Sequence, residues 1–164
     1  TYSYASDIGQ KLLCSSSHNT ATIDNKLQMS IRPPFLLYDW PKRLNVAKSD
    51  DLLQARMKFK SGYTHERTIR RKKREYIIED SISECKESEF YLNFHTVCDV
   101  EVEDYKIQLS YNDKTICYMY IDAEFEVVPV ERSLFYMQTD MIHCISIRKN
   151  SNEKIITRIV MEDN

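Results

Sequence analysis

The sequence of 164 residues contains only two glycines and four prolines. It therefore has few of the residues that most often form tight turns. No segment resembles a glycine-rich loop that binds phosphate groups. If the chain forms strands, Asn, Asp, Ser and Lys must occupy most of their turns. We therefore expect most connections to be longer than two-residue type I′ loops.

Other absences exclude whole classes of protein. No apolar run approaches the roughly 20 residues of a membrane-spanning helix. The net charge is −2 and the isoelectric point is about 6.1, so no overall basic charge attracts nucleic acid or anionic lipid. No stretch of about 12 or more residues repeats apolar side chains at helical spacing. With 42% hydrophobic and 29% charged residues, the chain is typical of one globular domain.

The cysteines form no recognisable motif. There are five of them, at positions 14, 85, 98, 117 and 144, with no C-x-x-C pair. This spacing excludes an obvious zinc knuckle or thioredoxin-type site. The odd number argues against a complete disulfide framework, although two bridges with one free thiol would also fit. Cys98, Cys117 and Cys144 lie in apolar runs, and we expect them to be buried side chains.

The residues that are present alternate between apolar and polar from position 51 onward. In DLLQARMKFK, for example, the apolar side chains of Leu53, Ala55 and Met57 share one face. Similar runs are YTHERTIRR, EYIIEDSI, FYLNFHTVC, YKIQLSY, TICYMYI, AEFEVVPV, SLFYM, MIHCISI and KIITRIVM. This period of two, without helices between the runs, predicts antiparallel sheets packed face to face. We expect one all-β sandwich domain over residues 1–164, with residues 33–50, which hold three prolines, as a loop or irregular edge segment.

His18 and Asn19 directly precede the short alternating run TATID. A neutral imidazole can bind a metal or act as an acid or base near neutral pH. A single histidine does not hold zinc, which needs three or four protein ligands. Asp7 and Asp24 are the nearest acids, and neither stands at a metal-ligand spacing. A ligand-binding role and a simple capping role therefore both remain open for His18.

His65 and Arg67 lie on the same face of a predicted strand. Together they could bind a carboxylate of a ligand, or they could pair with an acidic residue on the next strand. His95 and His143 lie within other predicted strands, and we interpret both as structural.

The run Arg70–Arg74 is the strongest local concentration of charge. Five consecutive cations could bind a sulfated or uronic polysaccharide, or RNA. The same run could form the solvated end of a hairpin between strands 63–69 and 75–82. The flanking acids and the small net charge favour the hairpin interpretation. The residues alone thus indicate a β-sandwich and leave its function unspecified.

Several motifs resemble the C-terminal region of heparinase II/III-like proteins. The family has a stretch like Asp-Pro-Gly-Thr-Tyr-Ser-Tyr, then Ser-Thr-x-x-His-Asn-Thr-Val-x-Val-Asp, then Gly-Tyr-x-x-His-x-Arg-x-Val. The corresponding segments here are 1–4, 16–24 and 62–69. Segment 76–82 is similar to the strand that follows in the family, and segment 92–95 to a strand that often ends in Phe-His. The resemblance extends over residues 1–100 and is most specific at His18-Asn19-Thr20.

The resemblance implies a sandwich domain that follows an α/α-toroid in the full-length protein. Members are polysaccharide lyases for uronic-acid glycans such as heparin, heparan sulfate or alginate. They cleave by β-elimination, in which a base removes the proton α to the uronate carboxylate and an acid protonates the leaving oxygen. The toroid and the strand with the family's other histidines are absent from this chain. We therefore expect a fragment that supports the toroid and lines the glycan cleft but is not catalytic by itself.

The resemblance also assigns individual residues. His18 matches a position that, in some members, binds a structural zinc together with an upstream His and Asp that are missing here. Zinc is thus expected in the full-length protein and not in this fragment. Asn19, His65 and Arg67 are predicted to bind substrate, so that the expected partners are an acidic polysaccharide and the upstream toroid, with no nucleic acid.

Two alternatives and the compartment stay open. The chain could be a non-catalytic module that binds acidic polysaccharide through Arg70–Arg74, or an interaction scaffold without any glycan contact. Family habit indicates the periplasm or secretion, whereas the scattered cysteines fit a reducing cytoplasm equally well.

Overall fold

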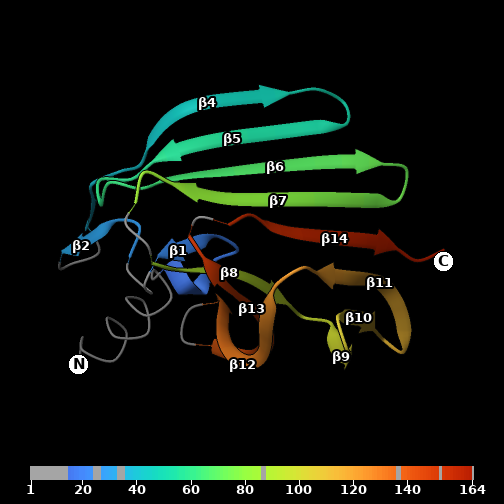
Figure 1. Cartoon of the computed structure of the whole chain (residues 1–164). Helices are drawn as coiled ribbons and strands as arrows, with labels where there is room; N and C mark the ends of the chain where they lie inside the picture. The colour runs from blue at the N-terminus through green and yellow to red at the C-terminus, as the bar shows by residue number, and fades with distance from the viewer. Residues whose placement is uncertain are drawn as a thin grey trace.

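The computed structural model describes residues 15–23, 27–32, 36–85, 88–135, 138–151 and 153–163, with only the backbone for Ile31 and Arg32. The chain folds into packed antiparallel sheets (Figure 1), which confirms the predicted all-β sandwich. One short 3-10 helix, η1 (Ser15–Ser17), precedes the first strand. No helix in these ranges is long and apolar enough to cross a membrane.

The strands are named in chain order. Their bounds are β1 Ala21–Ile23, β2 Ser30–Arg32, β3 Leu36–Tyr38, β4 Lys42–Lys48, β5 Leu52–Lys58, β6 Thr64–Lys72, β7 Glu75–Ser83, β8 Glu89–Thr96, β9 Asp99–Glu103, β10 Lys106–Tyr111, β11 Lys114–Ile121, β12 Glu124–Phe135, β13 Gln138–Asn150 and β14 Ile155–Met161.

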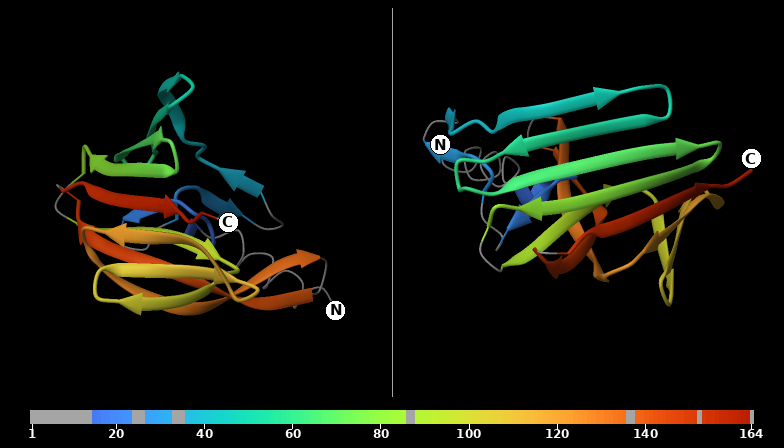
Figure 2. Two further views of the ribbon diagram at one scale, coloured as in Figure 1. Left: turned by 90° about the vertical axis from the view of Figure 1, so that its right-hand side faces the viewer. Right: turned by 45° about the horizontal axis from the view of Figure 1, so that its top comes forward.

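The two main sheets differ in size. The larger has eight strands in the order β4-β5-β6-β7-β14-β11-β10-β9, and the smaller has four in the order β1-β8-β13-β12. β2 and β3 form a separate two-stranded ribbon. Figures 1 and 2 show that β4 and β5 extend the larger sheet beyond the area that the smaller sheet covers.

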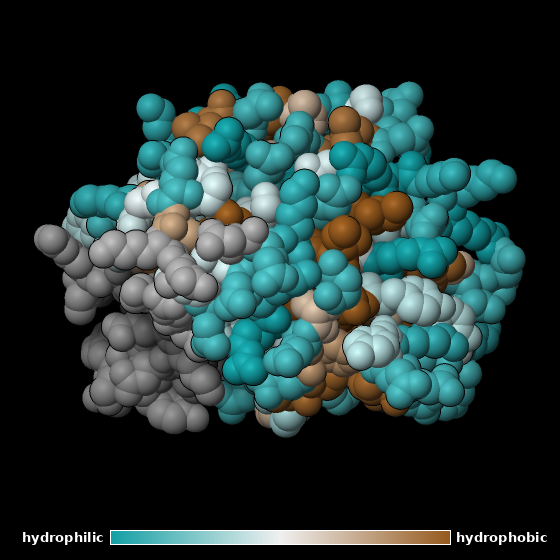
Figure 3. Space-filling model, viewed as in Figure 1, coloured by the Kyte–Doolittle hydropathy of each residue, from teal (hydrophilic) through white to brown (hydrophobic). Residues whose placement is uncertain are grey.

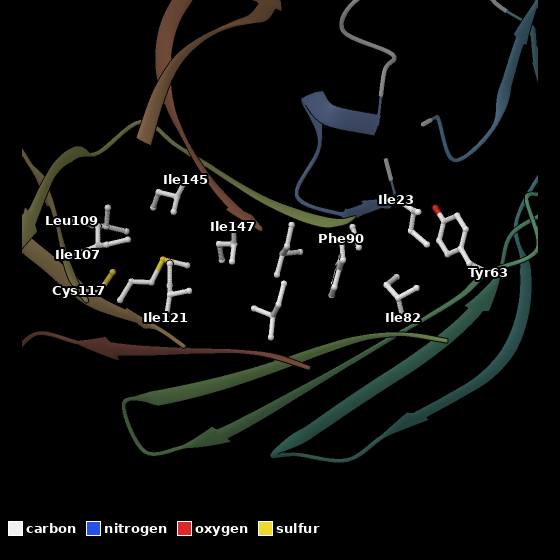
Figure 4. Packing of buried hydrophobic residues seen from close by; sticks show 14 of the residues in the cluster. Ile23, Tyr63, Ile82, Phe90, Ile107, Leu109, Cys117, Ile121, Ile145 and Ile147 are labelled. Carbon is white, nitrogen blue, oxygen red and sulfur yellow. The ribbon is translucent and has the colours of Figure 1, made fainter. Parts of the chain in front are cut away.

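The core lies between the inner faces of the two sheets (Figure 4). Phe90 and Leu92 of β8 and Ile145 and Ile147 of β13 are at most 1% exposed, as is Ile107 of the larger sheet. Burying each such side chain stabilises the fold by about 1.5–3 kcal/mol. Polar side chains alternate with them, and most of the surface seen in Figure 3 is therefore hydrophilic.

Of the two alternatives for residues 33–50, an irregular edge segment is confirmed for Lys42–Lys48, whose pairing is shifted between Arg43 and Asn45. These residues form β4, which pairs with β5 at the edge of the larger sheet. The prolines do not prevent this pairing, because Pro41 directly precedes the strand and none lies within it. An edge strand also needs hydrogen-bonding partners on one side only.

The prediction of long connections is wrong for the β6–β7, β9–β10 and β10–β11 hairpins, which all have two-residue turns. In β10–β11, Tyr111 pairs with Lys114, and Asn112 and Asp113 have positive φ angles of 51° and 59°. Lys73 and Asp104 take similar values of 56° and 53° in the other two turns. Asn and Asp tolerate this left-handed conformation better than most residues, so they replace glycine here.

The four cysteines in the described ranges are free thiols. Cys117 and Cys144 are buried as predicted, while Cys98 is only half-buried and Cys14 lies outside the described residues. Burial raises the pKa of the Cys117 thiol and raises that of Cys144 to about 11. Neither of these two thiols therefore ionises near neutral pH.

Candidate functional site

The segment His18–Thr20 connects η1 to β1 and lies against β8. The Asn93 backbone N–H donates to the Thr20 carbonyl at 3.3 Å, and the Asn93 side-chain amide donates to the Ser16 carbonyl at 3.0 Å. The Thr20 backbone N–H also donates to the His18 carbonyl at 2.8 Å. These bonds fix the segment while the side chains of His18 and Asn19 stay exposed.

Asn19 is bonded twice to His95, the outward-facing histidine of β8. Its Oδ1 accepts the His95 backbone N–H at 2.7 Å and lies 2.9 Å from His95 Nδ1. Because an amide oxygen only accepts, Nδ1 carries the proton and Nε2 of a neutral imidazole keeps a lone pair. Burial lowers the pKa of His95, and the nearby His18 lowers it further, so the neutral form is favoured at pH 7.

Sequence reasoning interpreted His95 as structural and did not connect it with Asn19. The Phe-His ending of segment 92–95 was a signal that pointed to this residue. The two residues are 76 positions apart in the chain, and only the pairing of β1 with β8 brings them together. His143 does make a structural contact, since its Nδ1 lies 3.1 Å from the Cys98 carbonyl.

His65 and Arg67 of β6 both bind Asp80, which lies directly opposite Arg67 on β7. Asp80 Oδ1 is 2.6 Å from His65 Nε2 and accepts the Arg67 Nε–H at 2.8 Å. Asp80 is 0% exposed, and its Oδ2 has no hydrogen-bond partner in the described part of the chain. Pairing with an acid on the next strand, one of the two sequence-based interpretations, is therefore confirmed for both residues.

Arg67 also connects this buried cluster to the His18–Thr20 segment. Its Nη1 donates to the Asn19 carbonyl at 3.0 Å, and its guanidinium carbon lies 5.9 Å from the centre of the Phe94 ring. The contacts therefore run from Asp80 through Arg67 to Asn19 and then to His95. This series joins the larger sheet to the smaller one.

His18 and His95 line a pocket of about 340 Å³. The complete lining is Ser17, His18, His95, Thr96, Val97, Glu131, Arg132, Ser133 and Ile142. His65 and Arg67 do not line this pocket. Arg67 contacts Asn19, and His65 contacts Asp80. A larger hollow of about 710 Å³ lies around Asp122 and Lys149 and includes none of the predicted site residues.

A zinc site is not complete among the described residues. No group of three His, Cys, Asp or Glu side chains in those ranges is arranged to hold a metal ion. His18 and His95 offer two nitrogen donors, whereas zinc takes three or four protein ligands. Asp7 and Asp24 lie outside the described residues. Zinc binding at His18 in the full-length protein thus stays a prediction.

The basic run Arg70–Arg74 forms the tip of the β6–β7 hairpin, as the sequence indicated. Arg70 pairs with Glu79, Arg71 with Asp51 and Arg74 with Asp163. In the described part of the chain, Lys72 and Lys73 have no acidic partner within salt-bridge distance. Nearby acidic side chains thus neutralise most of the positive charge of this hairpin.

Comparison with known proteins identifies the family. A sequence model described as "Heparinase II/III-like, C-terminal" matches residues 1–158. The chain belongs to this family. As a heparinase II/III-like C-terminal domain, it belongs to a family of polysaccharide lyases. No curated protein matches the chain by sequence.

Solved structures share the fold of this heparinase II/III-like domain. The heparan sulfate lyase HepC from Pedobacter heparinus superposes with a TM-score of 0.74 and 11% sequence identity, over 96% of this chain and 26% of that chain. The heparinase III that is the BT4657 gene product superposes with a TM-score of 0.71 and 14% identity, over 94% and 25%. This chain thus spans about a quarter of the length of the lyases that it matches.

Proposed function

We propose that this domain forms one wall of the glycan cleft in a lyase that cleaves uronic-acid glycans by β-elimination, and that it supports the upstream toroid. The family relationship supports the reaction class, and two of the matched structures are lyases named for heparan sulfate or heparin. In this reaction, negative charge develops next to the uronate carboxylate once its α-proton leaves. Hydrogen-bond donors that are fixed near this carboxylate lower the barrier.

The fixed position of Asn19 is the observation that carries this proposal. Its Oδ1 is occupied by two bonds from His95, and its backbone carbonyl is held by Arg67. No partner is found for its Nδ2 among the described residues, so two N–H donors are available at an exposed position beside the pocket. A donor that is already oriented needs no reorganisation when a uronate carboxylate binds.

The predicted roles of His65 and Arg67 are indirect in this proposal. Both side chains point at the buried Asp80, and Arg67 then holds Asn19. They would thus shape the substrate site through Asn19, while His18 beside the pocket would contact the glycan or a metal. The base and acid that act on the sugar would come largely from the upstream region, so the isolated chain would show no activity.

The test is lyase activity of the full-length protein on heparan sulfate, heparin and alginate, followed by the absorbance of the unsaturated uronate product. We expect Asn19→Ala to lower kcat/KM by about 10²-fold or more. Asn45→Ala, which removes an exposed amide on the edge strand β4, is the matched control and should leave activity unchanged. Activity on none of the glycans, or full activity of Asn19→Ala, would contradict the proposal.

The alternative is that the glycan binds to the basic hairpin Arg70–Arg74, and affinity for heparin distinguishes this from binding at Asn19. We compare K72Q/K73Q with K42Q/K48Q, which removes the same charge from the exposed edge strand β4. If the cleft at Asn19 binds the glycan, both variants should elute from a heparin column at the same, slightly lower salt concentration. A selective loss of affinity in K72Q/K73Q would favour the hairpin as the binding site.

A further inference from the structure

Two tyrosines lie in a row on the outer face of the larger sheet. Tyr118 and Tyr120 are two positions apart on β11, and the buried residues Cys117, Met119 and Ile121 alternate with them. Because successive side chains of a strand point to opposite faces, both tyrosines point away from the core. The rise of the strand separates them by about 7 Å. Both side chains are only half-buried, so their rings form part of the molecular surface.

A cation lies over each ring of this row. Lys106 Nζ is 4.2 Å from the centre of the Tyr118 ring, and the Arg158 guanidinium carbon is 5.5 Å from the centre of the Tyr120 ring. Lys106 comes from β10 and Arg158 from β14, the strands on either side of β11 (Figure 1). A ring attracts a cation without neutralising its charge. We call these four residues the tyrosine–cation surface.

The cations of this surface are available to a ligand. No carboxylate in the described part of the chain lies within salt-bridge distance of the Lys106 ammonium. The Nε–H of Arg158 donates to Glu75, and its two terminal nitrogens carry further donors. The arginines of the run Arg70–Arg74, in contrast, all pair with acidic side chains. The tyrosine–cation surface is therefore a stronger candidate for anion binding than the basic hairpin.

These groups fit a glycan that carries carboxylates or sulfates. An ammonium and a guanidinium form charge-assisted hydrogen bonds with such anions. A tyrosine offers an apolar ring and a hydroxyl that donates and accepts, which suits the C–H and O–H groups of a sugar. A protein partner would need a well-packed apolar centre. Opposite Tyr118 in the sheet lie Gln108 and Val160, both half-buried, so this face offers little apolar area.

The tyrosine–cation surface and the His18–His95 pocket lie on opposite outer faces of the sandwich. On β8 the buried Phe90 and Leu92 point into the core, and His95 points outward from the smaller sheet. The tyrosines point outward from the larger sheet, with the core between the two faces. A glycan bound at the tyrosines therefore does not occupy the pocket.

We propose that Lys106, Tyr118, Tyr120 and Arg158 form a second binding surface for an acidic glycan, which holds a long chain without taking part in its cleavage. A chain held there has a higher effective concentration at the cleft. The identity of the ligand as the substrate rests on the proposed function, whereas the arrangement of the four side chains does not.

Binding of the full-length protein to immobilised heparan sulfate tests this surface. The measurement is made in the Asn19→Ala background, so that cleavage is slow. K106Q/R158Q should weaken binding by about tenfold, as for the loss of two exposed charge contacts. K42Q/K48Q removes the same charge from β4 and should weaken it by no more than about twofold. Equal weakening by the two variants would overturn the proposal.

A second pair of variants separates a built surface from simple charge attraction. Y118F/Y120F keeps both rings and every charge but removes the hydroxyls, and should weaken binding about threefold, as for the loss of exposed hydrogen bonds. Y105F/Y111F removes two hydroxyls from side chains that are 74% and 51% exposed in nearby turns, and should leave binding unchanged. Unchanged binding of Y118F/Y120F would reduce the surface to a patch of charge and overturn the proposal.

Substrate length distinguishes this surface from the cleft. In the otherwise unchanged full-length protein, K106Q/R158Q should raise KM for polymeric heparan sulfate and leave kcat unchanged. It should not affect kcat/KM for a tetrasaccharide, which occupies the cleft alone. An equal loss on the tetrasaccharide would place these residues in the cleft and overturn the proposal. Selective loss of binding in a protein without lyase activity would support this surface and contradict the proposed function. Lyase activity that depends on Asn19, with unchanged binding in K106Q/R158Q, would do the reverse.

Discussion

Asp80 shows how one residue can determine the geometry of a site. A buried carboxylate is costly unless it is paired, and Asp80 receives both His65 and Arg67. The sequence left open whether His65 and Arg67 bind a ligand or pair with an acid on the next strand, and it could not say which acid that would be. That choice depends on the register of β6 against β7, which places Asp80 and not its neighbour Glu79 opposite Arg67.

Replacing Asp80 should therefore destabilise the domain strongly. We expect Asp80→Asn to lower the free energy of unfolding by about 3–5 kcal/mol, because it leaves the partly buried Arg67 charge without its partner. Urea denaturation measures this change. Glu79→Gln removes an exposed pair with Arg70 and should cost less than about 1 kcal/mol. Equal costs for the two variants would show that Asp80 is not a central contact.

The buried thiol of Cys144 makes stability depend on alkaline pH. Burial raises its pKa in the folded protein from 9.0 to about 11. Between these pH values the unfolded chain ionises first and binds fewer protons, so stability is intact below pH 9 and falls as the pH rises toward 11. We expect Cys144→Ala to lose less stability than the wild type between pH 8 and pH 11 in urea denaturation. The same loss in both proteins would contradict this.

At the scale of single elements, the two-residue turns replace glycine by residues that accept positive φ. The alternation of apolar residues predicted the strands well, because one face of each strand must be buried. The residue types of the turns were predicted correctly, since Asn, Asp and Lys take the positive φ angles, but the scarcity of glycine suggested longer loops than three hairpins have. The pairing of Tyr111 with Lys114 leaves only Asn112 and Asp113 to reverse the chain.

The β10–β11 turn tests whether Asn112 takes the place that glycine usually has in such a turn. We expect Asn112→Ala to lower the free energy of unfolding by about 1–2 kcal/mol, because Ala is strained at a φ of 51°. Asn112→Gly should stay close to the wild type, since glycine adopts positive φ readily. Urea denaturation of both variants checks the difference. A turn that tolerated Ala as well as Gly would contradict the assigned backbone conformation.

At the scale of the whole molecule, Arg67 is a polar connection between the two sheets. It lies on the larger sheet and holds the Asn19 carbonyl, while Asn19 in turn binds β8 of the smaller sheet through His95. This arrangement makes the shape of the pocket depend on the packing of the sandwich.

Arg67→Lys should loosen this connection without unfolding the domain. A lysine ammonium cannot reproduce the planar fork that reaches both Asp80 and Asn19. We expect the His95 amide, which donates to Asn19, to exchange with solvent about tenfold faster, as for the loss of one hydrogen bond. The Ile147 amide in the core should keep its rate. Equal acceleration at both amides would indicate general destabilisation, and an unchanged His95 amide would contradict the role of Arg67.

The sequence by itself determined the strands, the all-β sandwich and the buried Cys117 and Cys144, and it named His18 and Asn19 as candidate site residues. These features can be predicted because apolar alternation and short motifs are each contained within a single segment of the chain. The tertiary structure decided that His95 joins Asn19, that Asp80 is the acid for His65 and Arg67, and that the β12–β13 hairpin borders the pocket. These facts depend on strand order and register across many positions of the chain, and such long-range pairing is set by the packing of the whole core.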